Sequence, residues 1–370
     1  MRRTRTGAIM PDDIERLLAE LSEAPGPSGF EGSVRAVVRR ELAPLADEVE
    51  TDGLGSLIAR LGDPAGRPRV MLSAHMDELG LMVRRITSDG YLMFQPLGGW
   101  LDQALINQRW HILTSRGPVL GVTGIKTVHV MKPDERERVF KRDGMFIDVG
   151  ARDRADAEER LGIRPGDPVA PESPFAPLAG GDLYLGKAWD DRAGVGVLIE
   201  VLRRLREQPG PSTVFAVATV QEEVGLRGAG TSANRVAPDI GVNLESGVAG
   251  DYPGISEDEA QERLGGGPAI FLHDSSMLPN LKLRDLAIKV AADLGIELQF
   301  NVLTGYGQDG AAMQQAYAGA PVMNVTVPTR YLHSHNSVIH RGDFLGAVAL
   351  VTELVRRLDA ATVDEIRRFD

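Results

Sequence analysis

The sequence predicts an α/β fold in which helices sandwich a largely parallel sheet and a small β-rich domain is inserted. Two patterns support this prediction. Short apolar runs typical of buried strands alternate with amphipathic helical stripes on both sides of the middle of the chain. The middle itself consists of short β-like runs broken by glycine and proline. A chain of 370 residues is long enough for such an arrangement.

The N-terminal part reads as two helices followed by a buried strand. Residues 14–21 and 34–42 each place apolar side chains on one helical face, and "APGPSGFEG" between them is a loop. Pro11 is expected in the first turn of the first helix. The run "RVMLSAH", which ends at His75, reads as a buried strand.

The middle part reads as an inserted β-rich domain. Its β-like runs are "GYLMFQPLGG", "RWHILT", "GPVLGVTG", "GMFIDVGA" and "GIRPGDPVA". Only "ARDRADAEERLG" looks helical. We therefore expect residues 1–82 and 180–370 to form one catalytic domain, with residues 83–179 as the insert.

The C-terminal part returns to alternating strands and helices. A helix is expected in "RAGVGVLIEVLRRL" after Asp191, and further helical stripes cover residues 283–294 and 344–358. The runs that read as buried strands are "TVFAVATV", "DIGVNL", "PAIFLH", "ELQFNVL" and "APVMNVTV".

Composition narrows the function classes. The absence of cysteine removes thiolate nucleophiles and cysteine-type zinc sites. A net charge of −11 argues against a nucleic-acid partner. No apolar run approaches the ~20 residues that cross a bilayer, and no signal-peptide core follows the basic start "MRRTRTGAIM". We therefore expect a cytoplasmic protein with no nucleic-acid or membrane partner.

Histidines and carboxylates follow several of the predicted strands. They are His75 and Asp77, Asp190 and Asp191, Glu222 and Glu223, Glu245, and His333 and His335. In an open α/β sheet, ligands bind outside the carboxyl ends of the strands, so these side chains should gather in one region. Imidazole and oxygen ligands suit zinc, cobalt or manganese.

Each member of this set also has an ordinary interpretation. The pair Asp190 and Asp191 precedes a helix, where aspartate commonly acts as an N-cap. The pair Glu222 and Glu223 follows a strand, where a solvated turn is common. Repetition of the same chemistry after five strands favours a metal site over five unrelated caps and turns.

Four segments together resemble the M42 family of dinuclear metallo-aminopeptidases, the glutamyl and tetrahedral aminopeptidase group. They are "AHMDELG", "GKAWDDRAG", "VQEEVGLRGA" and "PTRYLHSH". The resemblance implies a three-layer zinc-peptidase-like catalytic domain that holds two divalent metal ions per chain, zinc or cobalt, with manganese as a third option. It also implies short peptides as substrates and a homo-oligomer, from dimer to dodecamer, built through the insert.

The resemblance further implies a role for each site residue. One metal would be bound by His75 and Glu245, the other by Glu223 and His333, and Asp190 would bridge them. Asp77 would accept a hydrogen bond from the His75 ring and fix its tautomer. Glu222 would be the general base, free of metal and beside the ligand Glu223. Such a base must reach the attacking water without being used as a ligand.

Other histidines compete with His333, and two positions depart from the family pattern. His335 is the main rival, and His340 is expected in a loop; His111, His129 and His273 have no carboxylate companions. The family's usual residue at position 245 is aspartate. Gln308 stands where the family commonly has threonine, before a retained Asp309.

The leading functional hypothesis is a metal-dependent aminopeptidase acting on short peptides. A deblocking or deacylating amidohydrolase on the same site is the closest alternative. A glucan hydrolase is disfavoured, because glycosidases need two metal-free carboxylates across the bond. A non-enzymatic binding module would require that the histidines and acids do not converge.

Overall fold

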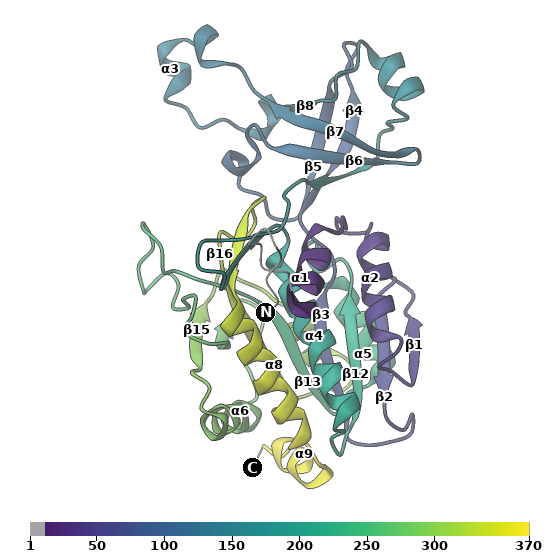
Figure 1. Cartoon of the computed structure of the whole chain (residues 1–370), viewed down its shortest axis with the longest axis vertical. Coiled ribbons are helices and arrows are strands. Elements are labelled where there is room, and N and C mark those ends of the chain that lie inside the picture. Colours follow the sequence, from purple (N-terminus) through teal and green to yellow (C-terminus); the bar gives the residue numbers. More distant parts are fainter. Residues whose placement is uncertain (1–11, 370) are drawn as a thin grey trace, which may run out of the picture.

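The computed structural model describes residues 12–369 and contains a three-layer α/β body that carries a small barrel. Figure 1 shows the barrel at the top and the α/β body below it. The described helices are α1 (Asp13–Glu23), α2 (Gly32–Leu42), α3 (Pro133–Arg136), α4 (Trp189–Glu207), α5 (Arg227–Val236), α6 (Leu281–Leu294), α7 (Gly310–Gln315), α8 (Arg341–Arg356) and α9 (Ala360–Ile366).

The strands divide between the body and the barrel. Those of the body are β1 (Glu48–Thr51), β2 (Leu57–Leu61), β3 (Arg69–His75), β10 (Ala176–Pro177), β11 (Leu183–Gly186), β12 (Thr213–Thr219), β13 (Ile240–Val248), β14 (Ala269–Asp274), β15 (Gln299–Leu303), β16 (Val322–Arg330) and β17 (Ser337–His340). Those of the barrel are β4 (Gly80–Ile86), β5 (Leu92–Leu97), β6 (Arg109–Thr114), β7 (Gly117–Gly124), β8 (Phe146–Asp148) and β9 (Pro168–Pro171).

The main sheet is parallel at its centre and antiparallel at its flanks. Strands β12, β3, β13 and β16 are parallel neighbours. The pairs β1–β2, β2–β12, β14–β16, β16–β17, β17–β11 and β11–β10 are antiparallel. The sheet is therefore more mixed than the sequence patterns predicted. The flanking strands β1, β10, β11 and β17 are too short to give a strand-length apolar signal.

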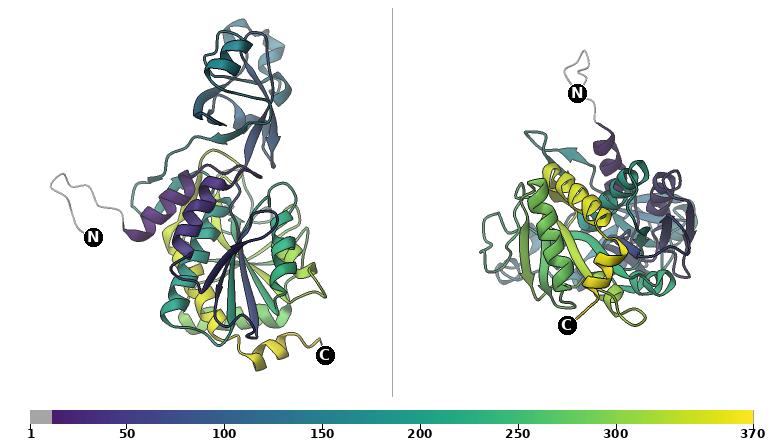
Figure 2. Two further views of the ribbon diagram at one scale, coloured as in Figure 1. Left: turned by 90° about the vertical axis from the view of Figure 1, so that its right-hand side faces the viewer. Right: turned by 90° about the horizontal axis from the view of Figure 1, so that it is seen from below.

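Helices cover both faces of the sheet, as Figure 2 shows in side view. Helices α1, α2, α4 and α8 contact one another on one face, and α5 and α7 pack together on the other. Successive residues of β2 illustrate the division, since Leu57 joins the large core of the first face and Ile58 the smaller core of the second. This arrangement confirms the predicted α/β class.

The barrel closes in the order β4-β5-β8-β7-β6-β9 and has its own apolar core, which includes Trp110, Ile112 and Ile147. Its strands run from Gly80 to Pro171, and the chain then rejoins the main sheet through β10. The predicted helix in this region is a single π-helical segment, Asp156–Arg160. Short helical turns that the sequence did not indicate occur at Asp102–Leu105, Val128–Val130 and Arg142–Gly144.

Several local features refine the predictions. Helix α1 begins at Asp13, and its N-cap Asp12 accepts a hydrogen bond from the Glu15 amide; Pro11 lies outside the described residues. Strand β15, predicted to be buried, is largely exposed or half-buried at the edge of the sheet. His340 is not a loop residue, because it ends β17 and its ring caps α8 by accepting from the Gly342 amide. No described helix is long and apolar enough to cross a membrane.

Candidate metal centre

The predicted site residues come from the carboxyl-end region of the central parallel strands. His75 ends β3, and Glu222 and Glu223 follow β12 after the two residues Val220 and Gln221. His333 lies in the loop after β16. Glu245 lies within β13, which continues to Val248, rather than beyond the end of the strand. The parallel register of these four strands brings the side chains to one edge of the sheet.

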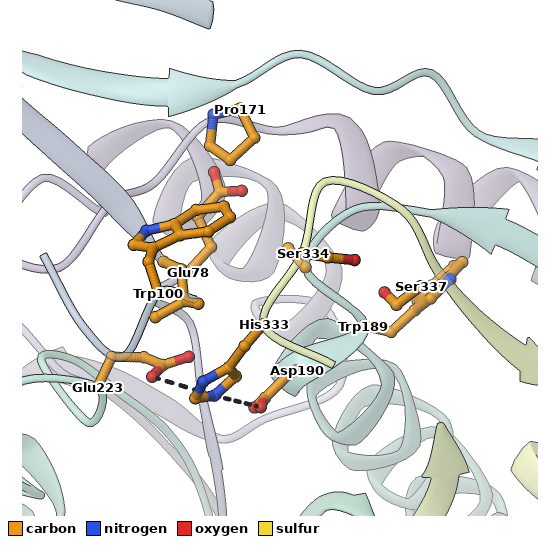
Figure 3. A pocket seen from close by; sticks show the side chains of 11 residues that line it. Glu78, Trp100, Pro171, Trp189, Asp190, Glu223, His333, Ser334 and Ser337 are labelled. Atoms are coloured by element: carbon orange, nitrogen blue, oxygen red, sulfur yellow. Dashed lines mark ion pairs between the residues drawn. The ribbon is translucent and has the colours of Figure 1, made fainter. Parts of the chain in front are cut away.

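Asp190 lies between the two histidines, with one carboxylate oxygen toward each. Its Oδ1 is 3.0 Å from His75 Nε2, and its Oδ2 is 3.3 Å from His333 Nε2. His333 Nε2 is also 3.6 Å from Glu223 Oε2, and Figure 3 shows the ring between these two carboxylates. A carboxylate that faces two separate imidazoles can serve two adjacent cations.

Glu245 and Glu222 lie on the His75 side of the cluster. His75 Nε2 is 3.4 Å from Glu245 Oε1 and 3.9 Å from Glu222 Oε2. Among residues 12–369, two groups of side chains bring potential ligand atoms within 4.8 Å of one another: His75, Asp190 and Glu223, and His75, Glu222 and Glu245. Distance alone therefore allows Glu222 as a ligand as well as a base.

Asp77 binds the backbone of the glutamate pair as well as facing His75. Its Oδ1 accepts from the Glu222 amide at 2.9 Å, and its Oδ2 accepts from the Glu223 amide at 3.2 Å and from Ser28 Oγ at 2.7 Å. The His75 Nδ1–H is closer to the Asp77 backbone oxygen (3.0 Å) than to its carboxylate Oδ1 (3.5 Å). The acceptor that fixes the His75 tautomer is thus mainly the main chain of Asp77.

The two adjacent aspartates have different contacts. Asp191 Oδ1 accepts from the Gly194 amide at 2.9 Å, which is the contact of an N-cap, and its Oδ2 accepts from the His75 amide at 3.1 Å. Asp191 and Asp190 have non-helical backbone angles at the start of α4. The cap interpretation therefore applies to Asp191, and Asp190 is left to face the histidines.

The cluster contains more acidic than basic side chains: four carboxylates and two imidazoles. Burial raises the pKa of Glu222 well above its ordinary value, and burial together with the Asp190 charge raises the pKa of Glu223 to about 8. Burial opposes protonation of His75, but Glu245 and Glu222 hold its pKa well above the ordinary value. Glu223 Oε1 and Glu245 Oε2 are buried without a hydrogen-bond partner. Buried, unpaired carboxylate oxygens beside imidazoles fit a cation.

A contact from the barrel orients His333. Its Nδ1–H donates to the backbone oxygen of Gly99 at 2.9 Å, which leaves Nε2 toward Asp190 and Glu223. Sequence reasoning missed this acceptor, because a backbone carbonyl 234 residues away leaves no side-chain signal.

The rival His335 lies away from the carboxylates. Its buried ring packs between Trp100 and Trp110, at centroid distances of 5.4 and 4.3 Å, and burial lowers its pKa to about 4. Among the described residues, His75 is the only histidine in the close ligand groups, and neither His111 nor His273 joins one. Exposed His129 joins none of these groups either.

A buried polar layer lies behind the cluster. Asp309 Oδ2 accepts from Thr219 Oγ1 at 2.6 Å, and burial raises the pKa of Asp309 to about 7. The neighbouring Gln308 donates from Nε2 to Asp274 Oδ2 at 3.3 Å. The amide at position 308 therefore belongs to a polar network with Asp274 rather than to the ligand groups.

Left-handed backbone conformations concentrate around the site. Residues with positive φ that are not glycine include Ala188, Gln221, Leu226, Tyr331 and His333, at +54° to +62°. Such conformations are costly for residues with a β-carbon and persist where surrounding contacts hold them. The amide of Gln221, for example, donates to Glu31 Oε1 at 3.2 Å.

A three-layer α/β body with this histidine and carboxylate edge defines the zinc-peptidase-like class of hydrolases. The sequence model of the family described as M42 glutamyl aminopeptidase matches residues 55–350. The chain belongs to this M42 family, as its sequence motifs predicted, and it is an aminopeptidase in class.

Solved structures and a curated relative agree with this assignment. A TET aminopeptidase from a marine-sediment archaeon of the Thaumarchaeota has a TM-score of 0.93 and 42% identity, covering 96% of this chain and 99% of that one. The TET1 peptidase of Pyrococcus horikoshii, which can assemble into a tetrahedron or a large octahedral shell, has a TM-score of 0.84 and 30% identity, covering 94% and 100%. The glutamyl aminopeptidase of Lactococcus lactis is 32% identical over 353 residues, 94% of this chain and 98% of the relative.

Proposed function

We propose that the protein is a dinuclear metallo-aminopeptidase that removes N-terminal residues from short peptides. One divalent ion would be held by His75 and Glu245, the other by Glu223 and His333, with Asp190 shared. The observation that carries the proposal is the Asp190 carboxylate, whose two oxygens face different imidazole Nε2 atoms at 3.0 and 3.3 Å.

The cluster suits cations because its acids are paired with imidazoles and, among the described residues, with no arginine or lysine. His75, Asp190, Glu223 and Glu245 belong to the close ligand groups, and His333 lies 3.3 Å from Asp190 and 3.6 Å from Glu223. Two buried carboxylate oxygens of this set, Glu223 Oε1 and Glu245 Oε2, have no hydrogen-bond donor. Zinc or cobalt best matches this mixed nitrogen and oxygen set, with manganese as a third option. When bound, two such ions supply Lewis-acid activation of water and of the scissile carbonyl.

Glu222 is proposed as the general base. Its buried carboxyl lines the same cleft as the proposed ligands and lies 3.9 Å from His75 Nε2, so it can take a proton from the attacking water and give it to the leaving amine. Asp77 holds the Glu222 amide at 2.9 Å and the Glu223 amide at 3.2 Å, so one carboxylate fixes the turn that presents both glutamates. Asp77 is therefore proposed as a positioning residue, assisted by Ser28.

The barrel is proposed to have two roles. Its strands, which run from Gly80 to Pro171, overlap the expected insert at residues 83–179. By analogy with the assembling TET1 relative, it would join copies of this chain into a homo-oligomer, from dimer to dodecamer. It also supplies the Gly99 oxygen that orients His333. Light scattering of the purified protein should give a mass well above that of a monomer, and a monodisperse monomer at micromolar concentration would refute the assembly role.

The alternative functions gain no specific support. The glutamyl and lysyl aminopeptidase relatives are named for peptide hydrolysis. Solved structures of 28% and 27% identity carry an endoglucanase name, but a name supplies no pair of metal-free carboxylates across a glycosidic bond. The binding-module alternative required that the histidines and acids stay apart, whereas they converge.

A substrate panel with matched ends tests the proposed function. Metal-free protein is reloaded with zinc, cobalt or manganese and given leucyl-alanyl-alanine, its N-acetylated form and a cello-oligosaccharide. We expect hydrolysis of the free-amino peptide only, and its loss with a chelator. Preferred cleavage of the N-acetyl bond would favour the deblocking alternative, and sugar release would favour the glucan hydrolase.

A further inference from the structure

A cleft beside the candidate metal centre has the position expected for the side chain of the N-terminal substrate residue. This Tyr306 cleft has a volume of about 250 Å³. Its lining consists of Gly99, Asp190, Glu222, Glu223, Leu226, Glu245, Gly305, Tyr306, Gly307 and His333. Because the lining includes the proposed base and metal ligands, a peptide whose scissile bond lies at the cluster places its first side chain in or near this space.

The walls of the Tyr306 cleft beyond the cluster carry no charge. Leu226 contributes a half-buried apolar side chain, and Gly305 and Gly307 are exposed at the opening. The Tyr306 hydroxyl donates to the Ser246 backbone oxygen at 2.7 Å. The single O–H donor of Tyr306 is therefore already hydrogen-bonded and cannot donate to a substrate carboxylate.

No arginine or lysine lines this cleft or the neighbouring cavity of Figure 3, within the part of the chain that the structure describes. The buried cations nearby have other partners. Lys187 Nζ lies 2.6 Å from Glu78 Oε2, and the Arg192 guanidinium donates to the backbone oxygens of Met76 and Leu21. Exposed Arg227 follows Leu226 in sequence, but its Nη1 donates to Gln221 Oε1 at 3.1 Å.

We infer that the Tyr306 cleft selects uncharged N-terminal residues and rejects acidic ones. The inference rests on the proposed aminopeptidase function and names its substrate class. A glutamate side chain along the Leu226 and Tyr306 walls would lose hydration without gaining an arginine, a lysine or a free donor, because the proposed metal ions serve the water and the scissile carbonyl, and it would lie near the proposed base Glu222. The uncharged glutamine side chain has the same shape without this penalty. The specificity therefore differs from what the name of the Lactococcus lactis relative indicates for that protein.

A matched substrate pair isolates the charge. Glutaminyl- and glutamyl-p-nitroanilide are compared on the metal-loaded, full-length enzyme, with leucyl-p-nitroanilide as an apolar reference. We expect kcat/KM for the glutaminyl substrate to exceed that for the glutamyl substrate by about 100-fold, the scale of an unpaired charge in a partly buried site. A ratio below about tenfold, or a preference for glutamate, overturns the inference.

Adding one cation to the wall provides a second measurement. Leu226→Lys should lower the glutaminyl-to-glutamyl ratio by at least about tenfold, because the new ammonium pairs with the substrate carboxylate. Leu226→Met, of similar volume and without charge, should keep the wild-type ratio. An unchanged glutaminyl-to-glutamyl ratio of kcat/KM in folded Leu226→Lys would show that Leu226 does not line the space for the first substrate side chain.

Failure of the two proposals is distinguishable. If no substrate with a free amino group is hydrolysed under any metal, the aminopeptidase function fails and the specificity inference fails with it. If leucyl and glutamyl substrates are both turned over and the glutamyl substrate is preferred, the function stands and only the specificity inference is wrong.

Discussion

Replacing Asp77 by asparagine should damage the site through the backbone of the glutamate pair. The buried Asp77 carboxylate accepts three hydrogen bonds, from the amides of Glu222 and Glu223 and from Ser28 Oγ. An asparagine keeps one acceptor oxygen and turns an NH2 group toward the remaining donors. The Ser28 hydroxyl can rotate to accept from that group, but a backbone amide cannot.

At least one buried amide is therefore left unsatisfied in Asp77→Asn, which costs about 1–3 kcal/mol of unfolding free energy. The turn must also shift to relieve the NH2–amide contact, and a displacement approaching 1 Å at catalytic groups can cost about 100-fold in rate. We expect kcat/KM on a leucyl peptide to fall by about that factor. Urea unfolding and steady-state kinetics on the metal-loaded enzyme measure the two effects separately.

Ser28→Ala is the matched control for Asp77→Asn. It removes one donor and leaves both amides with their carboxylate, so we expect a loss of about 1 kcal/mol and less than a tenfold drop in kcat/KM. Wild-type stability and activity in Asp77→Asn would show that Asp77 does not position the glutamates. A larger effect in Ser28→Ala than in Asp77→Asn would contradict the same reasoning.

The remaining predictions concern the base, the histidines, the Glu245 ligand and one buried acid. Glu222→Gln should retain bound metal but lose about 10²–10⁴-fold in kcat, and loss of metal would reverse the roles of the two glutamates. His333→Ala should abolish activity, whereas His335→Ala should keep a good part of it, because the His335 ring packs against Trp100 and Trp110. The opposite ranking would identify His335 as the ligand. Glu245→Asp should release the metal shared with His75 at lower chelator concentration than wild type, since the shorter side chain reaches less far from β13, and Glu245→Ala should release it more easily still; wild-type metal release and peptide turnover in Glu245→Ala would exclude Glu245 as a ligand. Burial raises the pKa of Glu262 from 4.5 to about 7, so the unfolded chain ionises this group first as pH rises. The unfolding free energy should therefore fall by about 3 kcal/mol between pH 4.5 and 7, as measured by urea titrations at several pH values. Glu262→Gln should remove this fall. An equally steep dependence on pH in the variant would show that Glu262 does not cause it.

Apolar periodicity was sufficient to predict the helices and strands that bury a continuous apolar face. Helices α1, α2 and α8 and the central strands β3, β12 and β16 carry such stripes or runs, and the structure confirms them. The flanking strands were not predictable in the same way. Strand β1, for example, consists of "EVET" with exposed and half-buried side chains, so its pairing with β2 depends on neighbours in space rather than on its own residues.

For the site, too, one part was predictable from the sequence and another was not. Strand-end histidines and acids indicated which side chains would meet, because parallel strands bring their carboxyl ends together. The contacts that orient them were invisible in the sequence. They are main-chain groups such as the Gly99 oxygen for His333 and the Asp77 oxygen for His75. Every residue carries these groups, so their use depends on the folded path of the chain alone.

The proposed sharing of Asp190 between two metal ions is tested by the metal content of Asp190 variants. Wild-type protein saturated with zinc or cobalt and freed of excess metal should contain two ions per chain by elemental analysis. Asp190→Ala removes the one carboxylate that faces both His75 and His333, so it should lose at least one ion and nearly all peptide turnover. Two ions and full turnover in folded Asp190→Ala, or full turnover in metal-free wild type, would show that Asp190 does not hold a catalytic metal pair.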